Sequence, residues 1–129
     1  MSQKKITNLA LDLTAELTSF CDNIKGRSIY TNQLLRSCSS IGANSFEAHY
    51  AQSTPDFISK LEIALKECYE TEYWLKVLER IGALDMDNFV YFCSKCGVIR
   101  RMLISSIKTT KARSEIEVAP DESESERRY

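Results

Sequence analysis

Cys93 and Cys96 form a CxxC pair, an arrangement that can bind a metal ion or perform thiol redox chemistry. A structural zinc site needs four ligands, usually two such pairs, and the chain has no second pair. A thioredoxin-like site needs the pair between a strand and a helix. Here both residues share one face of an expected helix with Phe89 and Ile99. Core packing of the two thiols is therefore the preferred interpretation, with zinc or redox chemistry as the alternative.

The cysteines are odd in number, and we expect the chain to lack a secretory signal. We expect all five to be buried free thiols that behave as small hydrophobic residues. They are Cys21, Cys38, Cys68, Cys93 and Cys96.

Carboxylates on helices can also bind a pair of metal ions. Di-iron bundles use Glu-x-x-His motifs from two helices and two further glutamates. The pair Glu67 and Glu70 has the spacing but no histidine, and His49 lies off the helix face of Glu47. A single histidine also leaves no Ser-His-acid set, and there is no phosphate-binding glycine loop. We therefore expect a non-enzymatic protein with no cofactor.

Two lines of polar residues predict a network between neighbouring helices. The first line is Arg36, Ser40, Asn44 and Glu47, and the second is Lys60, Glu67 and Glu70, close to Trp74. Arginine can hold a carboxylate through two hydrogen bonds, and Asn44 can bridge the two lines of polar residues. The structural interpretation is that the network fixes the register between the helices. The functional alternative is that Arg36, Lys60 or Lys66 contacts a ligand at a subunit boundary.

The stretch from Lys95 to Arg113 has six basic residues and no acidic residue. It is the best candidate for a nucleic-acid surface, formed by Lys95, Arg100, Arg101, Lys108 and Lys111. Phosphate binding by such residues falls steeply with salt. The alternative is a solvated helix face whose cations are favoured near the helix C-terminus. Residues 114–129 carry six acids and two arginines, and this tail can compete with nucleic acid for the basic stretch.

Three aromatic residues, Tyr69, Tyr73 and Trp74, cannot all face one core because they span more than one side of a helix. Exposed aromatic side chains are frequent in protein interfaces. This patch therefore predicts contact with another protein or another copy of the chain.

Four amphipathic segments position these residues. Apolar side chains recur every three or four residues within about 4–23, 30–52, 54–81 and 85–111, which predicts four helices. Ser53, Pro55 and Asp56 form a strong helix start, Gly82 is expected just after the helix end, and Asp85 or Asp87 caps the last helix. Short connections imply antiparallel neighbours. The predicted fold is an all-α, antiparallel up-down-up-down four-helix bundle over residues 1–112, followed by a disordered acidic tail over residues 113–129.

The length and composition fit this fold. A chain of 129 residues fits one domain, and 4 glycines with 2 prolines are too few for an all-β protein. We expect no signal peptide, and the sequence has no apolar run of the roughly 20 residues that span a bilayer. We expect a cytoplasmic protein without a membrane partner.

Two segments resemble a family signature: residues 33–48, QLLRSCSSIGANSFEA, and residues 56–75, DFISKLEIALKECYETEYWL. Together they resemble the prokaryotic four helix bundle protein family, also called the 23S rRNA intervening-sequence or S23 family. The resemblance covers roughly Ile6 to Lys111. It implies an antiparallel bundle that assembles as a ring-like homopentamer. A related branch, the accessory variability protein of diversity-generating retroelements, binds nucleic acid and partners a reverse transcriptase.

Two functions follow as expectations. The first is a homo-oligomeric accessory or scaffold protein that binds RNA or DNA through its basic surface, with a reverse transcriptase as a further partner. The alternative is a structural or protein–protein interaction module that does not bind nucleic acid.

Overall fold

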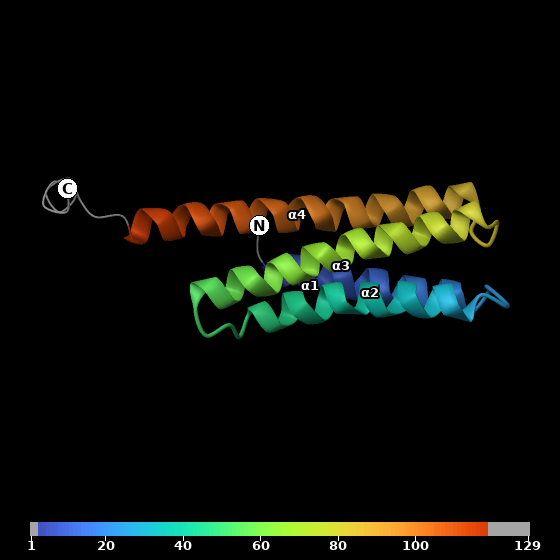
Figure 1. Cartoon of the computed structure of the whole chain (residues 1–129), viewed down its shortest axis with the longest axis horizontal. Helices are drawn as coiled ribbons and strands as arrows, with labels where there is room; N and C mark the ends of the chain where they lie inside the picture. The colour runs from blue at the N-terminus through green and yellow to red at the C-terminus, as the bar shows by residue number, and fades with distance from the viewer. Residues whose placement is uncertain (1–2, 119–129) are drawn as a thin grey trace, which may run out of the picture.

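The computed structural model describes residues 3–118 as four α-helices joined by short connections (Figure 1). The helices are α1 (Gln3–Cys21), α2 (Ser28–Ala48), α3 (Thr54–Arg80) and α4 (Met86–Val118). Each helix packs against the next one along the chain, and α1 also contacts α4. The predicted all-α four-helix bundle is therefore confirmed.

The ends of the helices follow from local chemistry. Ser53 Oγ accepts a hydrogen bond from the Asp56 amide at 3.1 Å, which caps α3. The side chain of Asp85 accepts from the Asn88 amide at 2.9 Å, so Asp85 rather than Asp87 caps α4. Gly82 follows α3 with φ of +79°, a left-handed conformation that glycine adopts without strain. The caps expected from the sequence are thus present.

One continuous core fills the bundle. The α3 stripe is buried from Leu61 to Leu78, and a matching stripe on α4 faces it. These buried positions are Leu61, Ala64, Cys68, Thr71, Leu75 and Leu78 on α3, with Phe92, Cys96, Ile99, Leu103 and Ile107 on α4. The hydroxyl of Thr71 donates to Ser37 Oγ at 3.0 Å, which links α3 to α2 inside this core. The apolar residues expected to recur along 54–81 therefore pack inward.

The last helix is longer than the sequence suggested. α4 was expected to end near Lys111, but it continues to Val118 and projects beyond the start of α3 (Figure 1). Ala112, Arg113 and Glu115 favour helix, so local propensity extends α4 where composition indicated only a solvated segment. Residues 113–118 of the predicted tail are thus helical. Residues 119–129 of that tail lie outside the described residues.

Within residues 3–118, no helix combines the length and the apolar character needed to cross a lipid bilayer.

Candidate nucleic-acid interface

The predicted basic residues of α4 divide between two sides of the helix. Lys95 faces α1, because it lines a hollow with Leu9 and Asp12. Its Nζ atom lies 5.1 Å from the centre of the Tyr91 ring. The other four face α3 or point outward: Arg100, Arg101, Lys108 and Lys111. The structure therefore separates Lys95 from the rest of the predicted site.

Two of these cations connect α4 to α3. Arg100 Nε donates to Glu72 Oε1 at 3.0 Å, and the hydrogen bond raises the pKa of Arg100 above its ordinary value. Lys111 Nζ lies 3.2 Å from Glu62 Oε2, with both side chains half-exposed. Arg100 and Lys111 thus have a structural role as ion-pair partners, and a carboxylate partly offsets the charge of each.

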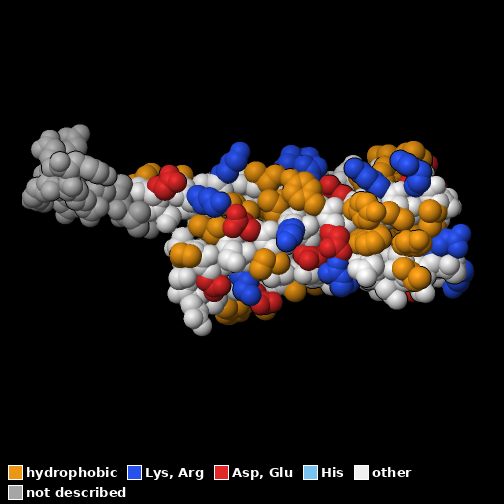
Figure 2. Space-filling view, viewed as in Figure 1, with side chains coloured by type: hydrophobic (Ala, Val, Ile, Leu, Met, Phe, Trp, Pro, Cys, Tyr) orange, Lys and Arg blue, Asp and Glu red, His pale blue; other side chains and the backbone are white. Residues whose placement is uncertain are grey.

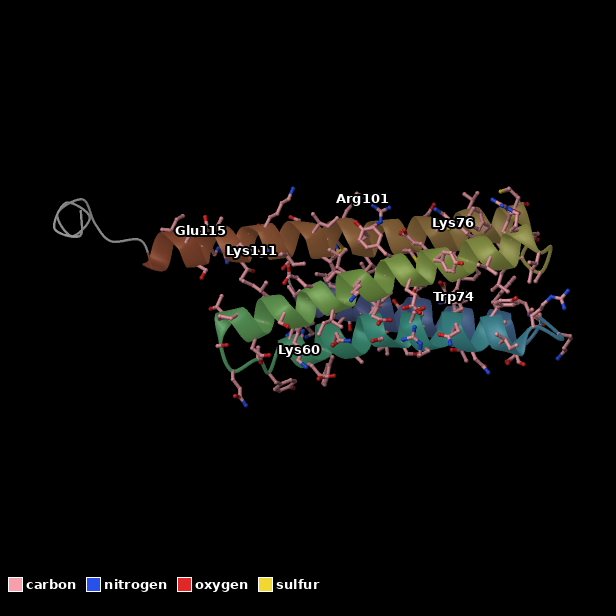
Figure 3. The ribbon with its side chains drawn as sticks, viewed as in Figure 1. Lys60, Trp74, Lys76, Arg101, Lys111 and Glu115 are labelled. Atoms are coloured by element: carbon pink, nitrogen blue, oxygen red, sulfur yellow. The ribbon has the colours of Figure 1, made fainter. Side chains whose placement is uncertain are left out.

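Two cations of α3 extend the basic surface, and the sequence did not assign them to it. Lys66 and Lys76 are exposed, and with Tyr69 and Tyr73 they follow one face of α3 at spacings of three and four residues. Figure 3 shows Lys76 of α3 and Arg101 of α4 on the side of the bundle where these helices run next to each other. Their spacing in the sequence predicts that the four residues share one face of a helix. Only the packing of the helices shows that this face lies next to α4.

We call this region the α3/α4 surface. It consists of Lys66, Tyr69, Tyr73 and Lys76 from α3, with Arg100, Arg101, Lys108 and Lys111 from α4. Among the described residues, four of its cations form no ion pair, namely Lys66, Lys76, Arg101 and Lys108. Six cations belong to this surface, and Glu62 and Glu72 pair with two of them. Figure 2 shows Lys and Arg side chains beside hydrophobic ones over α3 and α4.

The predicted polar network is present at one end. The Arg36 guanidinium donates to Glu67 Oε2 at 3.3 Å and also to Glu70. Trp74 Nε1 donates to Glu70 Oε2 at 3.0 Å. The indole hydrogen bond, together with the Arg36 charge, lowers the pKa of Glu70 below its ordinary value. This part of the network ties α2 to α3, as the structural interpretation expected.

The rest of that network does not connect to Arg36. Lys60 Nζ pairs separately with Glu47 Oε1 at 3.2 Å. Asn44 donates to the carbonyl of Ser40 at 2.9 Å and to its hydroxyl at 3.0 Å, both within α2. The expected bridge through Asn44 is therefore not formed, because the amide finds its partners one turn away on its own helix. Two separate cross-links replace the single predicted network.

Four of the five cysteines are buried as expected from the sequence, and Cys93 is the exception. Cys96 is buried and Cys93 is half-buried, and Cys68 Sγ donates to the Cys96 carbonyl at 3.4 Å. Burial raises the pKa of the Cys21 and Cys38 thiols to about 11, and that of Cys96 is raised by its interaction with Cys68 and by burial. High thiol pKa values oppose nucleophilic chemistry. Across residues 3–118, no three histidine, cysteine or acidic side chains are grouped to hold a metal ion.

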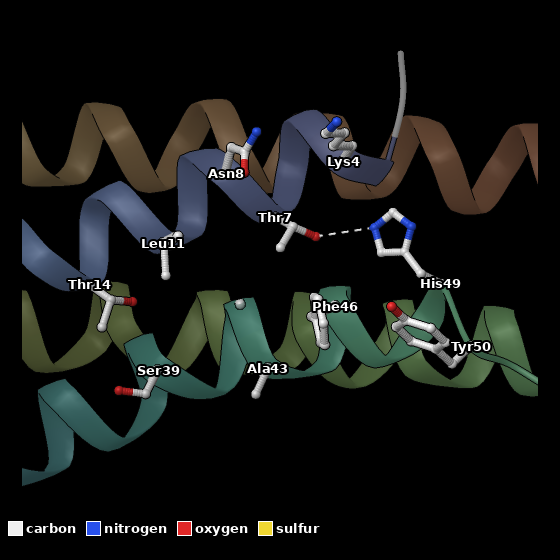
Figure 4. Close-up of a pocket in the computed structure, with 11 residues that line it drawn as sticks. Lys4, Thr7, Asn8, Leu11, Thr14, Ser39, Ala43, Phe46, His49 and Tyr50 are labelled. Carbon is white, nitrogen blue, oxygen red and sulfur yellow. Dashed lines mark hydrogen bonds between the residues drawn. The ribbon is translucent and has the colours of Figure 1, made fainter.

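An apolar groove runs between α1 and α2, and the sequence did not predict it. Its volume is about 730 Å³, and Figure 4 shows side chains of the two helices facing each other across it. Gly42 and Ala43 form part of its lining. Leu11, Phe46 and Tyr50 flank it and are 65%, 54% and 73% exposed. The small residues of α2 were the available signal, since they allow close approach of another helix.

His49 lies at one end of this groove. Its Nε2 atom is 3.5 Å from Thr7 Oγ1, a contact drawn in Figure 4. Lys4 lines the same end. The groove is thus apolar over most of its length, with basic and titratable side chains at the end near the start of α1.

Known proteins are similar to this chain over most of its length. Residues 2–105 match the model of the family described as 23S rRNA-intervening sequence protein. A crystal structure of a protein of unknown function from the S23 ribosomal protein family of Bacteroides thetaiotaomicron VPI-5482 is 38% identical. It superimposes with a TM-score of 0.80 and covers 84% of this chain and 99% of its own. No curated protein matches the chain.

Proposed function

The chain belongs to the 23S rRNA-intervening sequence protein family, and from this premise we propose that it is a homo-oligomeric accessory or scaffold protein that binds nucleic acid. The observation that carries the proposal is the α3/α4 surface, where four cations without ion pairs lie beside two exposed tyrosines. The proposal includes no catalytic role.

Electrostatics supports the use of this surface. The formal net charge of the whole chain is −1, so an attraction for nucleic acid has to be local. The α3/α4 surface brings together, on two packed helices, four cations that form no ion pair with any described residue. Each lysine or arginine that neutralises a phosphate releases counterions, which favours binding at low salt.

A charge-reversal experiment tests the proposal. The full-length protein is titrated into labelled RNA and labelled DNA at several salt concentrations. The double variant Arg101→Glu and Lys108→Glu should lose about tenfold or more in affinity, with a shallower dependence on salt. The control is the double variant Lys25→Glu and Arg27→Glu, which changes the net charge by the same amount but lies at the connection between α1 and α2. Absence of binding by the unchanged protein at low salt, or equal losses in both variants, would contradict the proposal.

Self-association is the second part of the proposal, and the α1/α2 groove is its surface. The occupant is a second copy of the chain, in line with the homopentamer that the family resemblance implies. The groove has small residues along its base and large, exposed apolar side chains beside it. An exposed apolar patch of this kind is typical of a protein interface. In a ring the contact is heterologous, so the groove of one copy meets a different face of the next. The residues that line the groove belong to α1 and α2 and are separate from those of the α3/α4 surface.

The alternative function is a structural or protein–protein interaction module that does not bind nucleic acid. The groove supports this alternative as well, because it needs only a protein partner. Self-association in the absence of any RNA or DNA binding would select the alternative. A reverse transcriptase as partner remains a prediction from the family resemblance.

A further inference from the structure

Two tyrosines occupy the middle of the α3/α4 surface. Tyr69 is 50% exposed and Tyr73 is 57% exposed. They are four residues apart on α3, so their backbones are separated by about 6 Å along the helix axis. Lys66 precedes them and Lys76 follows them on the same face. The four side chains form a line of cation, ring, ring and cation.

Neighbouring side chains hold both rings in place. The Arg100 guanidinium lies 5.9 Å from the centre of the Tyr69 ring, and the same arginine is fixed by its hydrogen bond to Glu72. The Tyr73 ring meets Trp74 edge to face, with 5.0 Å between ring centres. Contacts of this kind limit ring motion before any ligand binds. Both residues still expose half or more of their surface.

The exposed rings favour one class of nucleic acid. In a duplex the faces of the bases are covered by neighbouring bases, so exposed tyrosine rings cannot stack on them. Tyrosines would therefore add little affinity for a duplex that is bound only through its phosphates. In a single strand the base faces are free to stack on aromatic rings while cations follow the phosphates. We infer that the α3/α4 surface binds single-stranded RNA or DNA, with Tyr69 and Tyr73 stacking on bases and Lys66, Lys76 and Arg101 contacting phosphates. This inference rests on the proposed nucleic-acid binding and specifies its ligand.

A comparison of strands and ring variants tests the inference. Labelled oligo(U), labelled oligo(dT) and a mixed-sequence duplex of equal length are titrated with the full-length protein, and fluorescence anisotropy is recorded. Single strands should bind at least tenfold more tightly than the duplex. Tyr69→Ala and Tyr73→Ala should each lower single-strand affinity about tenfold and change duplex affinity little. Tyr69→Phe and Tyr73→Phe keep the ring and should keep most of the affinity.

The matched control is Tyr91→Ala. Tyr91 is also an exposed tyrosine, but its hydroxyl donates to Glu16 at 2.8 Å on the α1 side of the bundle. Its removal should leave nucleic-acid affinity unchanged. Light scattering on each variant records the oligomeric state, which the ring variants should not alter.

The possible outcomes separate the inference from the proposed function. Equal affinity for duplex and single strands, with no effect of the Tyr→Ala changes, would overturn the inference and leave nucleic-acid binding standing. No binding of any probe would overturn both. A changed oligomeric state in the Tyr→Ala variants would identify the rings as a protein interface and overturn the inference. Lost binding in the Phe variants would assign recognition to the hydroxyls instead of stacking and would also overturn it.

Discussion

Arg36 of α2 and Trp74 of α3 donate hydrogen bonds to the same oxygen atom, Oε2 of Glu70. This shared acceptor joins two helices through one carboxylate. Both donations favour the ionised carboxylate, which is why the pKa of Glu70 is lower than usual. Arg36 is half-exposed, so solvent screens its charge and limits what the ion pair contributes to stability.

The shared acceptor predicts an acid-dependent contribution to stability. Because the pKa of Glu70 is depressed in the folded state, its contribution is present above the unfolded pKa and is lost as pH falls through the folded pKa. Glu70→Gln should lower the free energy of unfolding by about 1 kcal/mol at neutral pH, and the difference should shrink in acid. Chemical denaturation across this pH range measures it. Glu62→Gln, in the half-exposed pair with Lys111, is the control and should cost less. Equal, pH-independent effects of the two changes would argue against the shared acceptor.

The fold was readable from the sequence because its signals are local. Apolar periodicity located the helices, and Ser53, Gly82 and Asp85 carry the chemistry that starts or ends them. The predicted end of α4, near Lys111, is too early. An acidic, serine-rich composition indicates that a segment is exposed to solvent, but the backbone conformation also depends on the helix propensity of its residues.

The candidate site was less predictable, because it depends on which faces of two helices meet. A basic stretch in the sequence winds around all sides of a helix, so Lys95 was grouped with residues that lie on another face. Lys66 and Lys76 belong to the α3/α4 surface only once α3 is packed against α4. Asn44 illustrates the same limit, since spacing cannot tell whether an amide bonds across helices or along its own.

Substitution of Gly42 by alanine is expected to make the protomer more stable. A Cβ atom built at Gly42 would lie 3.5 Å from Ala10 Cβ, an ordinary van der Waals distance, so packing within the bundle does not require glycine. Gly42→Ala should therefore raise the free energy of unfolding of the protomer by about 0.5–1 kcal/mol, since alanine favours helix. Thermal and chemical denaturation at low protein concentration measure this. Gly82→Ala is the control and should destabilise, because φ there is +79°. Destabilisation by Gly42→Ala would show that the contact with α1 is tighter than the geometry indicates.

The α1/α2 groove predicts the surface of self-association. Phe46 is more than half exposed beside the groove, so Phe46→Glu should leave the protomer folded and place a charge against the second copy. We expect a shift to lower mass in size-exclusion chromatography with light scattering, at unchanged helical content by circular dichroism. Ile29 is also apolar and is more exposed than Phe46 but lies outside the groove, so Ile29→Glu should leave the mass unchanged. If the protein is monomeric from the start, or if both variants behave alike, self-association through this groove is refuted.

The buried thiol of Cys38 predicts a loss of stability in alkali. Burial raises its pKa to about 11, above the ordinary value of 9.0. Between these two pH values the unfolded thiol ionises and the folded one does not, so the free energy of unfolding falls as pH rises, by about 1.4 kcal/mol per pH unit. Cys38→Ala should remove about that much of the slope between pH 9 and 11, whatever its cost at neutral pH. Urea denaturation at stepped pH provides the measurement, and parallel slopes for the two proteins would exclude a strongly raised pKa.

The acidic tail predicts competition for the α3/α4 surface. Residues 119–129 contain four acids and two arginines, and acids near a basic surface weaken its attraction for phosphates. Deletion of residues 119–129 keeps α4 intact and should raise affinity for RNA or DNA about threefold at low salt, less at high salt. Deletion of residues 114–129 also removes Glu115 and Glu117 and should raise affinity further. A full-length variant with the four tail acids changed to glutamine separates charge from length. It keeps Arg127 and Arg128, so its net charge rises more than that of the shorter deletion, and its affinity should rise at least as much. Unchanged affinity in all three would rule out competition by the tail.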